Sequence, residues 1–174
     1  MIVGISGSLR ARSSNAALLR AVARITPIHM YEGMGRLPHL NPDLDAEGSE
    51  PPAEVRELRE LLIAADAVVI SCPEYAHGVP GSMKNLLDWL VSTGELVDKP
   101  VVLLNASPAG GDYAQQALLE TLRTMNWRVV GEASLIEPFV RRKIADELED
   151  EESLGTLRRA IDALLRAIYS SGMA

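Results

Sequence analysis

The chain has 174 residues, 17 of them Lys or Arg and 24 Asp or Glu, which gives a formal net charge of −7. This length suits a single domain, residues 1–174, built around one hydrophobic core. The acidic balance argues against a polyanion-binding surface, so we expect no nucleic-acid partner, and it says little else about what the protein binds.

Apolar runs typical of buried strands alternate with amphipathic runs typical of helices. A strand over residues 2–6 precedes a helix over residues 14–24, and a weaker strand over residues 28–31 follows. The Gly- and Pro-rich passage 33–48 shows no periodicity. We therefore expect an irregular surface loop there.

The middle of the chain contains its strongest strand. Ser49 is expected to cap a helix whose first turn accommodates Pro51 and Pro52 and whose apolar positions recur from Val55 to Ala65. Residues 67–72 are β-branched or small and uncharged. Such a run belongs in the centre of a sheet.

Further elements follow at regular intervals. We expect a helix over residues 82–92, a central strand over 101–105, and a helix capped by Asp112 with Leu118, Leu122 and Met125 inward. A strand from Val129 to Ile136 comes next. The sequence thus predicts five strands with helices between them.

The last helix carries an apolar stripe at 3-4-3-4 spacing from Leu154 to Ile168, preceded by acidic residues from Asp146 to Glu152. Acidic residues at the start of a helix agree with its dipole. The stripe is typical both of a helix packed on a sheet and of a dimeric coiled-coil seam. Both interpretations stay open at this point.

Strands alternating with helices predict an α/β fold with a doubly wound parallel sheet. In such sheets ligands bind beyond the carboxyl ends of the strands, where the strand order reverses. The polar or glycine-bearing loops 7–15, 73–81 and 105–112 all follow strands. We expect them to lie along one edge of the sheet and to carry the chemistry.

The first of these loops reads GSLRARSSN and is rich in hydrogen-bond donors. They are Ser8, Arg10, Ser13, Ser14 and Asn15. Together with a helix N-terminus they suit a terminal phosphate, while the side chain of Ser13, Ser14 or Asn15 could also cap the helix. The alternative, a capped and solvated turn, stays open. No G-x-x-x-x-G-K-[ST] phosphate motif occurs.

The second loop and the helix after it read PEYAHGVPG and SMKNLLDWL. The pattern PEYxxGxPGxxKNxxDWL after a central strand, with GSLRxxSxN after the first strand, closely resembles the NADPH-dependent FMN reductase family. These flavodoxin-like flavoproteins also include quinone, chromate and azo-dye reductases. The resemblance covers nearly the whole chain and implies a flavodoxin-like, doubly wound sheet of five parallel strands in the order 2-1-3-4-5, with helices on both faces.

The resemblance also implies which residues contact the cofactor. Ser8, Arg10, Ser13 and Asn15, with Ser14 as a helper, match the cradle of the FMN phosphate. The segment that runs along the isoalloxazine corresponds to Pro73, Glu74, Tyr75, Ala76, His77 and Gly78. A third loop near the pyrimidine end of the ring is matched less closely by Ser107, Pro108, Gly110 and Gly111. Many relatives have Asn where this chain has Ala76, so a side-chain contact is absent here.

The function implied is that of an FMN-dependent NAD(P)H oxidoreductase. FMN accepts hydride from NADPH or NADH and passes electrons to flavin, a quinone or a similar small-molecule acceptor, so no catalytic side chain is named. Neither flavin loop contains Trp, which leaves one face of the ring open to a nicotinamide. The alternative is a flavodoxin-like electron-transfer protein that docks on protein partners. A homodimer or homotetramer is implied by the resemblance alone.

Several remaining residues invite functional interpretations. His77 is either a donor to flavin or acceptor, or a packing residue. His29 and His39 lack partners at metal-ligand spacing, so no metal site is expected. Cys72, the only cysteine, lies in an apolar strand and excludes an internal disulfide, which favours an inert thiol and a reducing compartment, the cytoplasm. With no export segment and with Asp66 breaking the longest apolar run, we expect no membrane association.

Overall fold

The computed structural model describes residues 1–46, 48–106, 111–131, 134–136 and 151–171. Its strands are β1 (Ile2–Ser6), β2 (Ile28–Tyr31), β3 (Ala67–Ser71), β4 (Pro100–Asn105), β5 (Arg128–Val129) and β6 (Leu135–Ile136). Its α-helices are α1 (Ser14–Ile25), α2 (Ala53–Ala64), α3 (Gly81–Asp88), α4 (Asp112–Thr124) and α5 (Glu151–Ser171). Short 3₁₀ turns span Met34–Arg36, Pro42–Leu44 and Gly94–Leu96.

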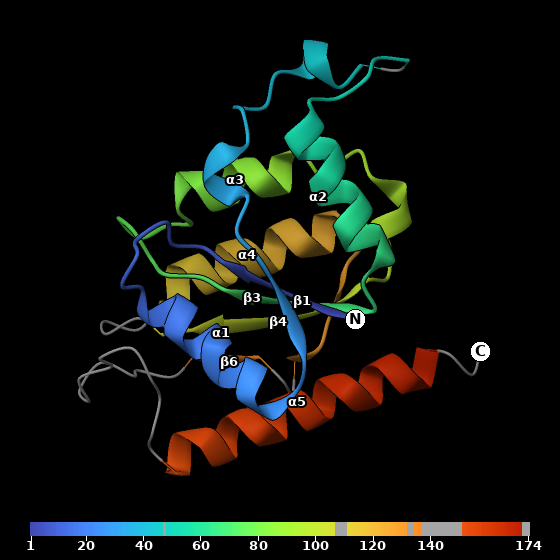
Figure 1. Cartoon of the computed structure of the whole chain (residues 1–174). Coiled ribbons are helices and arrows are strands. Elements are labelled where there is room, and N and C mark those ends of the chain that lie inside the picture. The colour runs from blue at the N-terminus through green and yellow to red at the C-terminus, as the bar shows by residue number, and fades with distance from the viewer. Residues whose placement is uncertain (47, 107–110, 132–133, 137–150, 172–174) are drawn as a thin grey trace.

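The strands form one parallel sheet in the order β2-β1-β3-β4-β5, with β6 also paired to β4 (Figure 1). Ile2 of β1 lies opposite both Ile28 of β2 and Ala67 of β3. The strand order therefore reverses at β1, and in folds of this kind ligands bind at the carboxyl ends of the strands beside such a reversal, here β1 and β3. The predicted flavodoxin-like fold with strand order 2-1-3-4-5 is confirmed.

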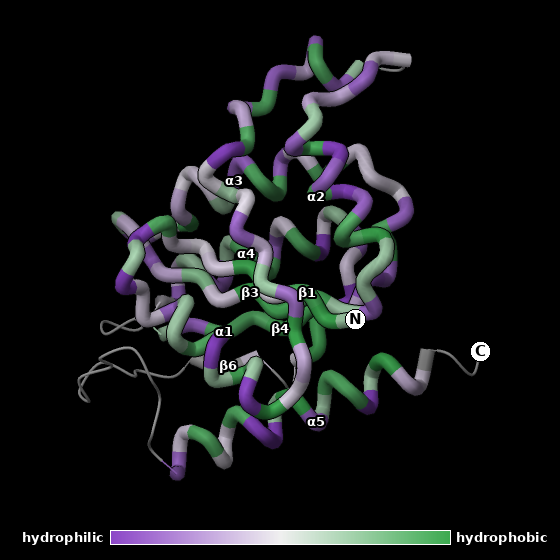
Figure 2. The backbone as a smooth tube through the Cα atoms, in the orientation of Figure 1, coloured by the Kyte–Doolittle hydropathy of each residue, from purple (hydrophilic) through white to green (hydrophobic). Residues whose placement is uncertain are grey.

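Helices cover the sheet in two layers, with α1 and α5 on one face and α2, α3 and α4 on the other (Figure 1). Every residue of β3 is buried, which fits its uninterrupted apolar sequence. Val68 and Ile70 pack in the cluster with α2, α3 and α4, while Val69 packs in the cluster with α1 and α5. Figure 2 shows the hydrophobic strands between helices that carry hydrophilic stretches.

The stripe of α5 packs on the sheet. Leu157, Ile161 and Leu164 are almost fully buried in one cluster with Val69 and Val102 of the central strands. Burying a side chain of this size stabilises the fold by about 1.5–3 kcal/mol. Of the two interpretations left open by the sequence, the helix packed on a sheet is therefore confirmed.

The strand predicted over residues 129–136 is divided into β5 and β6, which pair with different parts of β4. Between them Ser134 donates a hydrogen bond from its backbone N–H to the carbonyl of Gly131, at 3.1 Å. The hydroxyl oxygen of Ser134 accepts the N–H of Leu103 at 3.2 Å. The Ser134 hydroxyl thus accepts the Leu103 N–H in place of a backbone carbonyl from a neighbouring strand. The prediction of one continuous strand was wrong.

Two predicted helix caps were also wrong. Ser49 donates its hydroxyl to the carbonyl of Ala46 at 2.7 Å, and α2 begins after Pro52, whose carbonyl accepts the first helical hydrogen bonds. Asp112 is the first residue of α4, and Gly111 stands at the cap. In both cases the backbone conformation before the helix decided its start.

Helix α3 ends at Asp88, four residues before the predicted end, and its side chains hold the loop over residues 33–48. Asn85 accepts the N–H of Leu40 at 2.8 Å and donates to the carbonyl of Pro38 at 2.9 Å. The indole N–H of Trp89, a fully buried residue, donates to the same carbonyl at 2.8 Å. The expected irregular loop is thus held against α3 by hydrogen bonds from two side chains, those of Asn85 and Trp89.

Candidate functional site: the carboxyl edge of β1 and β3

The loop after β1 starts pressed against the end of β3. The N–H of Gly7 donates to the carbonyl of Ser71 at 2.8 Å. A Cβ atom at Gly7 would lie 2.7 Å from the Sγ of Cys72 and 3.1 Å from the Cδ of Pro73. Only glycine fits this close approach, so the sequence GSLR can leave the strand directly beside the second loop.

The first two loops are joined by side-chain hydroxyls. The Oγ of Ser8 and the Oη of Tyr75 lie 3.3 Å apart in a hydrogen bond, and the same Oγ accepts the N–H of Arg10 at 3.3 Å. The loops at residues 7–15 and 73–81 therefore share one edge of the sheet, as the sequence predicted. Tyr75 is half exposed, so an aromatic face is available beside this edge.

The N-terminus of α1 closes the first loop. Ser13 is the N-cap: its side chain accepts the N–H of Ala16 at 3.3 Å. Ser14 and Asn15 are the first helical residues, whose N–H groups have no carbonyl partner within the helix. These N–H groups and the positive end of the helix dipole favour an anion at this loop.

Asn15 has a structural task that sequence reasoning did not predict. Its carboxamide is buried, and its Oδ1 accepts the Ser71 hydroxyl at 2.9 Å and the N–H of Ala106 at 3.2 Å. One side chain thus joins α1 to the ends of β3 and β4. Because Oδ1 already accepts these two protein donors, what Asn15 can offer a phosphate at this loop is its backbone N–H and the N–H groups of its Nδ2.

The second loop turns as a two-residue hairpin. The N–H and carbonyl groups of Tyr75 and Gly78 exchange two hydrogen bonds of 3.0 Å, and a β-bridge joins these residues. Ala76 and His77 form the tip with φ angles of 49° and 58°. Such a turn favours Asn and Gly, which adopt positive φ angles readily. Alanine and histidine adopt them at a cost in conformational free energy.

Glu74 connects this hairpin to α4. Its Oε2 accepts the N–H of Ala114 in the first turn of that helix at 3.0 Å, and its Oε1 lies 3.7 Å from the Nδ1 of His77. The ring of His77 packs edge-on against Tyr113, with centroids 4.4 Å apart. The carboxylate therefore stabilises the helix start, and Tyr113, not predicted from the sequence, joins the site.

The third predicted loop is described only at its end, because Ser107, Pro108 and Gly110 lie outside the described residues. Gly111 has a φ angle of 131°, and a Cβ atom there would lie 2.0 Å from the Nδ2 of Asn105. No other residue fits without displacing Asn105. Gly111 therefore fixes the direction in which the chain enters α4.

The Cys72 thiol is buried. Burial raises the pKa of the Cys72 thiol to about 12, so the group stays protonated at neutral pH. Among the described residues, no group of His, Cys, Asp and Glu side chains is arranged to hold a metal ion. No helix in the described part of the chain is both long and apolar enough to cross a bilayer.

Residues 1–140 match the family model for NADPH-dependent FMN reductases. The chain belongs to this family. A quinone reductase of Escherichia coli K12 is 30% identical over 164 residues, covering 90% of this chain and 87% of that protein. An NAD(P)H-dependent FMN reductase of Pseudomonas aeruginosa is 38% identical over 128 residues, covering 70% of this chain and 68% of that one.

Solved structures agree with this membership. The flavoenzyme NAD(P)H:(acceptor) oxidoreductase FerB from Paracoccus denitrificans superposes with a TM-score of 0.82 at 27% identity, over 97% of both chains. Being an NADPH-dependent FMN reductase by family, the chain is an FMN-dependent NAD(P)H oxidoreductase. The resemblance seen in the sequence is thus confirmed.

The residues on the sheet edge fit the family's cofactor. A dianionic phosphate needs several donors and positive charge, and the first loop supplies the Ser8 hydroxyl, the Arg10 guanidinium and the first N–H groups of α1. A flat ring needs an adjoining surface, which the hairpin at residues 75–78 offers. The Ser8–Tyr75 hydrogen bond keeps both parts together.

Proposed function

We propose that the protein transfers hydride from NAD(P)H through FMN to a quinone or a free flavin, with FMN held at the carboxyl edge of β1 and β3. The observation that carries this proposal is the hydrogen bond between Ser8 and Tyr75, which joins an anion-binding loop to the hairpin beside it. FMN supplies the redox chemistry when bound. The acceptor class rests on the quinone and FMN reductases among the relatives.

In this proposal the protein binds, orients and shields. Ser8, Arg10 and the first turn of α1 hold the phosphate, with Ser13 fixing the helix start. The segment Pro73 to Gly78 lies along the ring, mainly through its backbone, and Ser107, Pro108, Gly110 and Gly111 approach its pyrimidine end. No side chain has to act as an acid or a nucleophile. The electron-carrier alternative gains no support from relatives named as reductases.

The test is a titration of the flavin-free protein with FMN, followed by flavin fluorescence. Arg10→Ala removes a charge-assisted hydrogen bond of about 1.5–3 kcal/mol, so we expect the Kd for FMN to rise about tenfold to a hundredfold. Arg12→Ala removes the same charge two residues away and serves as the matched control. Equal Kd values for both variants would refute the phosphate assignment, and absence of NAD(P)H oxidation with FMN and a quinone would refute the function.

We infer further that the chain is one domain that works as a homo-oligomer in the cytoplasm. Leu40, Leu44 and Val91 are large apolar side chains exposed on the surface, and exposed apolar surface favours association. The single cysteine suits a reducing compartment that supplies NAD(P)H. Light scattering of the purified protein decides between a monomer, which would contradict this inference, and a dimer or tetramer.

A further inference from the structure

Two exposed rings meet where the hairpin at residues 75–78 touches the start of α4. The imidazole of His77 and the phenol ring of Tyr113 pack as a T-shaped pair, with centroids 4.4 Å apart. Tyr113 is 57% exposed and the side chain of His77 is 74% exposed, so both rings are open to solvent. Of the three exposed tyrosines in the described part of the chain, Tyr75 and Tyr113 lie at this edge of the sheet and Tyr169 lies on α5. We call the pair of His77 and Tyr113 the aromatic wall.

The aromatic wall is held in position by the backbone and by one carboxylate. A Cβ atom at Gly111 would collide with a neighbouring side chain, so the direction of the chain is fixed shortly before Tyr113. Glu74 accepts the N–H of Ala114 at 3.0 Å, and its other carboxylate oxygen lies 3.7 Å from the Nδ1 of His77. Both rings are thus positioned before a ligand arrives, which lowers the conformational entropy lost on binding.

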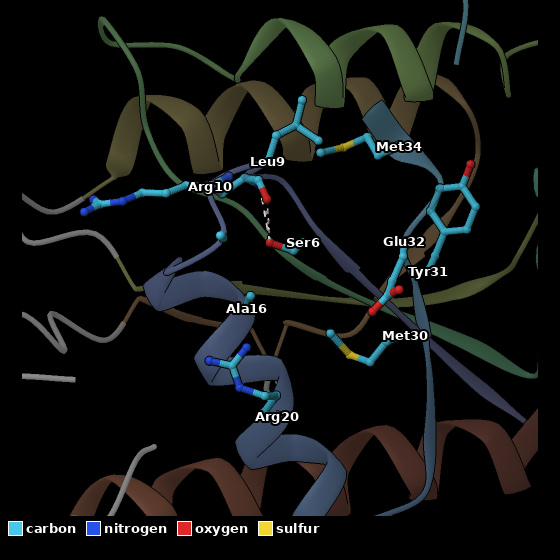
Figure 3. Close-up of a pocket in the computed structure, with 11 residues that line it drawn as sticks. Ser6, Leu9, Arg10, Ala16, Arg20, Met30, Tyr31, Glu32 and Met34 are labelled. Atoms are coloured by element: carbon cyan, nitrogen blue, oxygen red, sulfur yellow. Dashed lines mark hydrogen bonds between the residues drawn. The ribbon is translucent and has the colours of Figure 1, made fainter. Parts of the chain in front are cut away.

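The hairpin separates the aromatic wall from the phosphate side of the site. Tyr75 of the hairpin is bonded to Ser8 of the first loop, whereas Glu74 and His77 contact α4. The cavity of about 520 Å³ that is lined by the first loop, α1 and the segment after β2 lies on the phosphate side (Figure 3). With the isoalloxazine along the hairpin, as proposed above, the aromatic wall stands at the end of the site opposite the phosphate loop.

We propose that Tyr113, with His77 packed against it, contacts the flat ring of a neutral quinone and selects such acceptors over acceptors that have no ring. The proposal rests on the function proposed above and names a residue that decides its acceptor. Aromatic side chains pack favourably on other flat rings, face to face with an offset or edge to face. Glu74 and Asp112 place negative charge beside the wall, which favours a neutral acceptor over an anion.

The electrons and protons of the transfer balance for both kinds of acceptor. A quinone takes one hydride from the anionic reduced flavin and one proton from water, and it leaves as a hydroquinone while the flavin returns to its oxidised form. Two ferricyanide ions take the same two electrons, one each, and the proton of the flavin leaves to water. Only the quinone has a ring that Tyr113 contacts. The comparison of the two acceptors therefore isolates the contribution of that contact.

The test measures how fast the reduced, FMN-loaded protein passes electrons to menadione and to ferricyanide, by anaerobic stopped-flow absorbance of the flavin. We expect Tyr113→Ala to lower the ratio of the menadione rate constant to the ferricyanide rate constant about threefold to tenfold. Tyr113→Phe keeps the ring, so its ratio should stay within about twofold of the unsubstituted protein. Tyr169→Ala removes an exposed tyrosine from α5 and is the matched control, for which we expect an unchanged ratio.

An unchanged ratio in Tyr113→Ala overturns the proposal. This includes the case in which both rate constants fall by the same factor, because lost support of the hairpin would slow both acceptors alike. Equal falls of the ratio in Tyr113→Ala and Tyr113→Phe also overturn it, since they assign the effect to the hydroxyl. Thermal unfolding and the flavin content verify that each variant is folded and loaded.

The function proposed above has a separate measurement in the same preparations. Dithionite reduces the flavin for the acceptor test, so the ratio does not depend on the nicotinamide. Mixing the oxidised, FMN-loaded protein with NAD(P)H shows whether the nicotinamide reduces the flavin. Failure of that reduction in the unsubstituted protein refutes the proposed function, whereas an unchanged acceptor ratio refutes only the role of Tyr113.

Discussion

Ala76 and His77 hold the tip of the hairpin in the left-handed region, with φ angles of 49° and 58°. An L-residue with a Cβ atom loses about 1–2 kcal/mol in this region, whereas Asn adopts it more readily. We expect Ala76→Asn to raise the free energy of unfolding by about 0.5–1 kcal/mol in urea denaturation. Ala117→Asn, on the exposed face of α4, should lower it by a similar amount, because Asn is a poorer helix former. A loss of stability at both positions would show that the turn carries no strain.

The thiol of Cys72 should be unreactive in the folded protein. With a pKa of about 12, roughly one thiol in ten thousand is ionised at pH 8, compared with a substantial fraction in the unfolded chain, where the pKa is about 8.5. Folding raises this pKa because the buried thiol resists ionisation. The free energy of unfolding is therefore unaffected by Cys72 below a pH of about 8.5, and it falls as the pH rises from there toward 12, because only the unfolded chain ionises in that range. Reaction with a chromogenic disulfide at pH 8 should be slow until guanidinium is added. Equally fast reaction of native and denatured protein would contradict the burial of the thiol.

At the scale of single residues, the sequence identified the loops better than the tasks of their side chains. Ser8 and Arg10 were predicted in one polar loop, and they share a hydrogen bond there. Asn15 and Glu74 stay predicted cofactor contacts, and their side-chain oxygens in addition bind groups of the protein, which the sequence did not indicate. Residue type specifies a donor or an acceptor, whereas its partner depends on how strands far apart in the sequence are placed. Tyr113 was missed because only its position at the start of α4 could have indicated it.

At the scale of elements, Asn15 is the point where α1, β3 and β4 are joined. Asn15→Ala would leave the Ser71 hydroxyl and the N–H of Ala106 buried without their acceptor. We expect a loss of about 1–3 kcal/mol in the free energy of unfolding. We also expect weaker FMN binding, since the loops that follow β3 and β4 lose their hydrogen bonds to α1. Ser14→Ala, one residue earlier in the same turn, is the control and should change stability less than about 1 kcal/mol. Equal losses of unfolding free energy in the two variants would show that the hydrogen bonds accepted by Asn15 do not stabilise the carboxyl edge of the sheet.

The strands differed in how well their sequences predicted them. β1, β3 and β4 are continuous apolar runs buried on both faces, so their composition alone indicates their place. β5 and β6 have two residues each, and their separation depends on the Ser134 hydroxyl meeting the N–H of Leu103. α2 starts at Ala53 after Pro52, while the hydroxyl of Ser49 donates to the carbonyl of Ala46 and caps no helix. Contacts of this kind have no periodic pattern in the sequence.

At the scale of the whole molecule, the alternation of strands and helices was sufficient to predict a sheet with helices on both faces. It also placed the polar loops on one edge, because parallel strands end on the same side. The sequence did not indicate the cavity beside β2, since its walls come from the first loop, α1 and the segment after β2 (Figure 3). Three separate stretches meet there only in the folded chain.

The position of the FMN phosphate is the central claim, and a crystal structure of the protein with FMN tests it most directly. The phosphate should lie within hydrogen-bond distance of the Ser8 hydroxyl, the Arg10 guanidinium and the first N–H groups of α1, with the ring beside the hairpin at residues 75–78. Well-defined FMN density elsewhere, for instance in the cavity lined by Gln115 and Trp127, would contradict it.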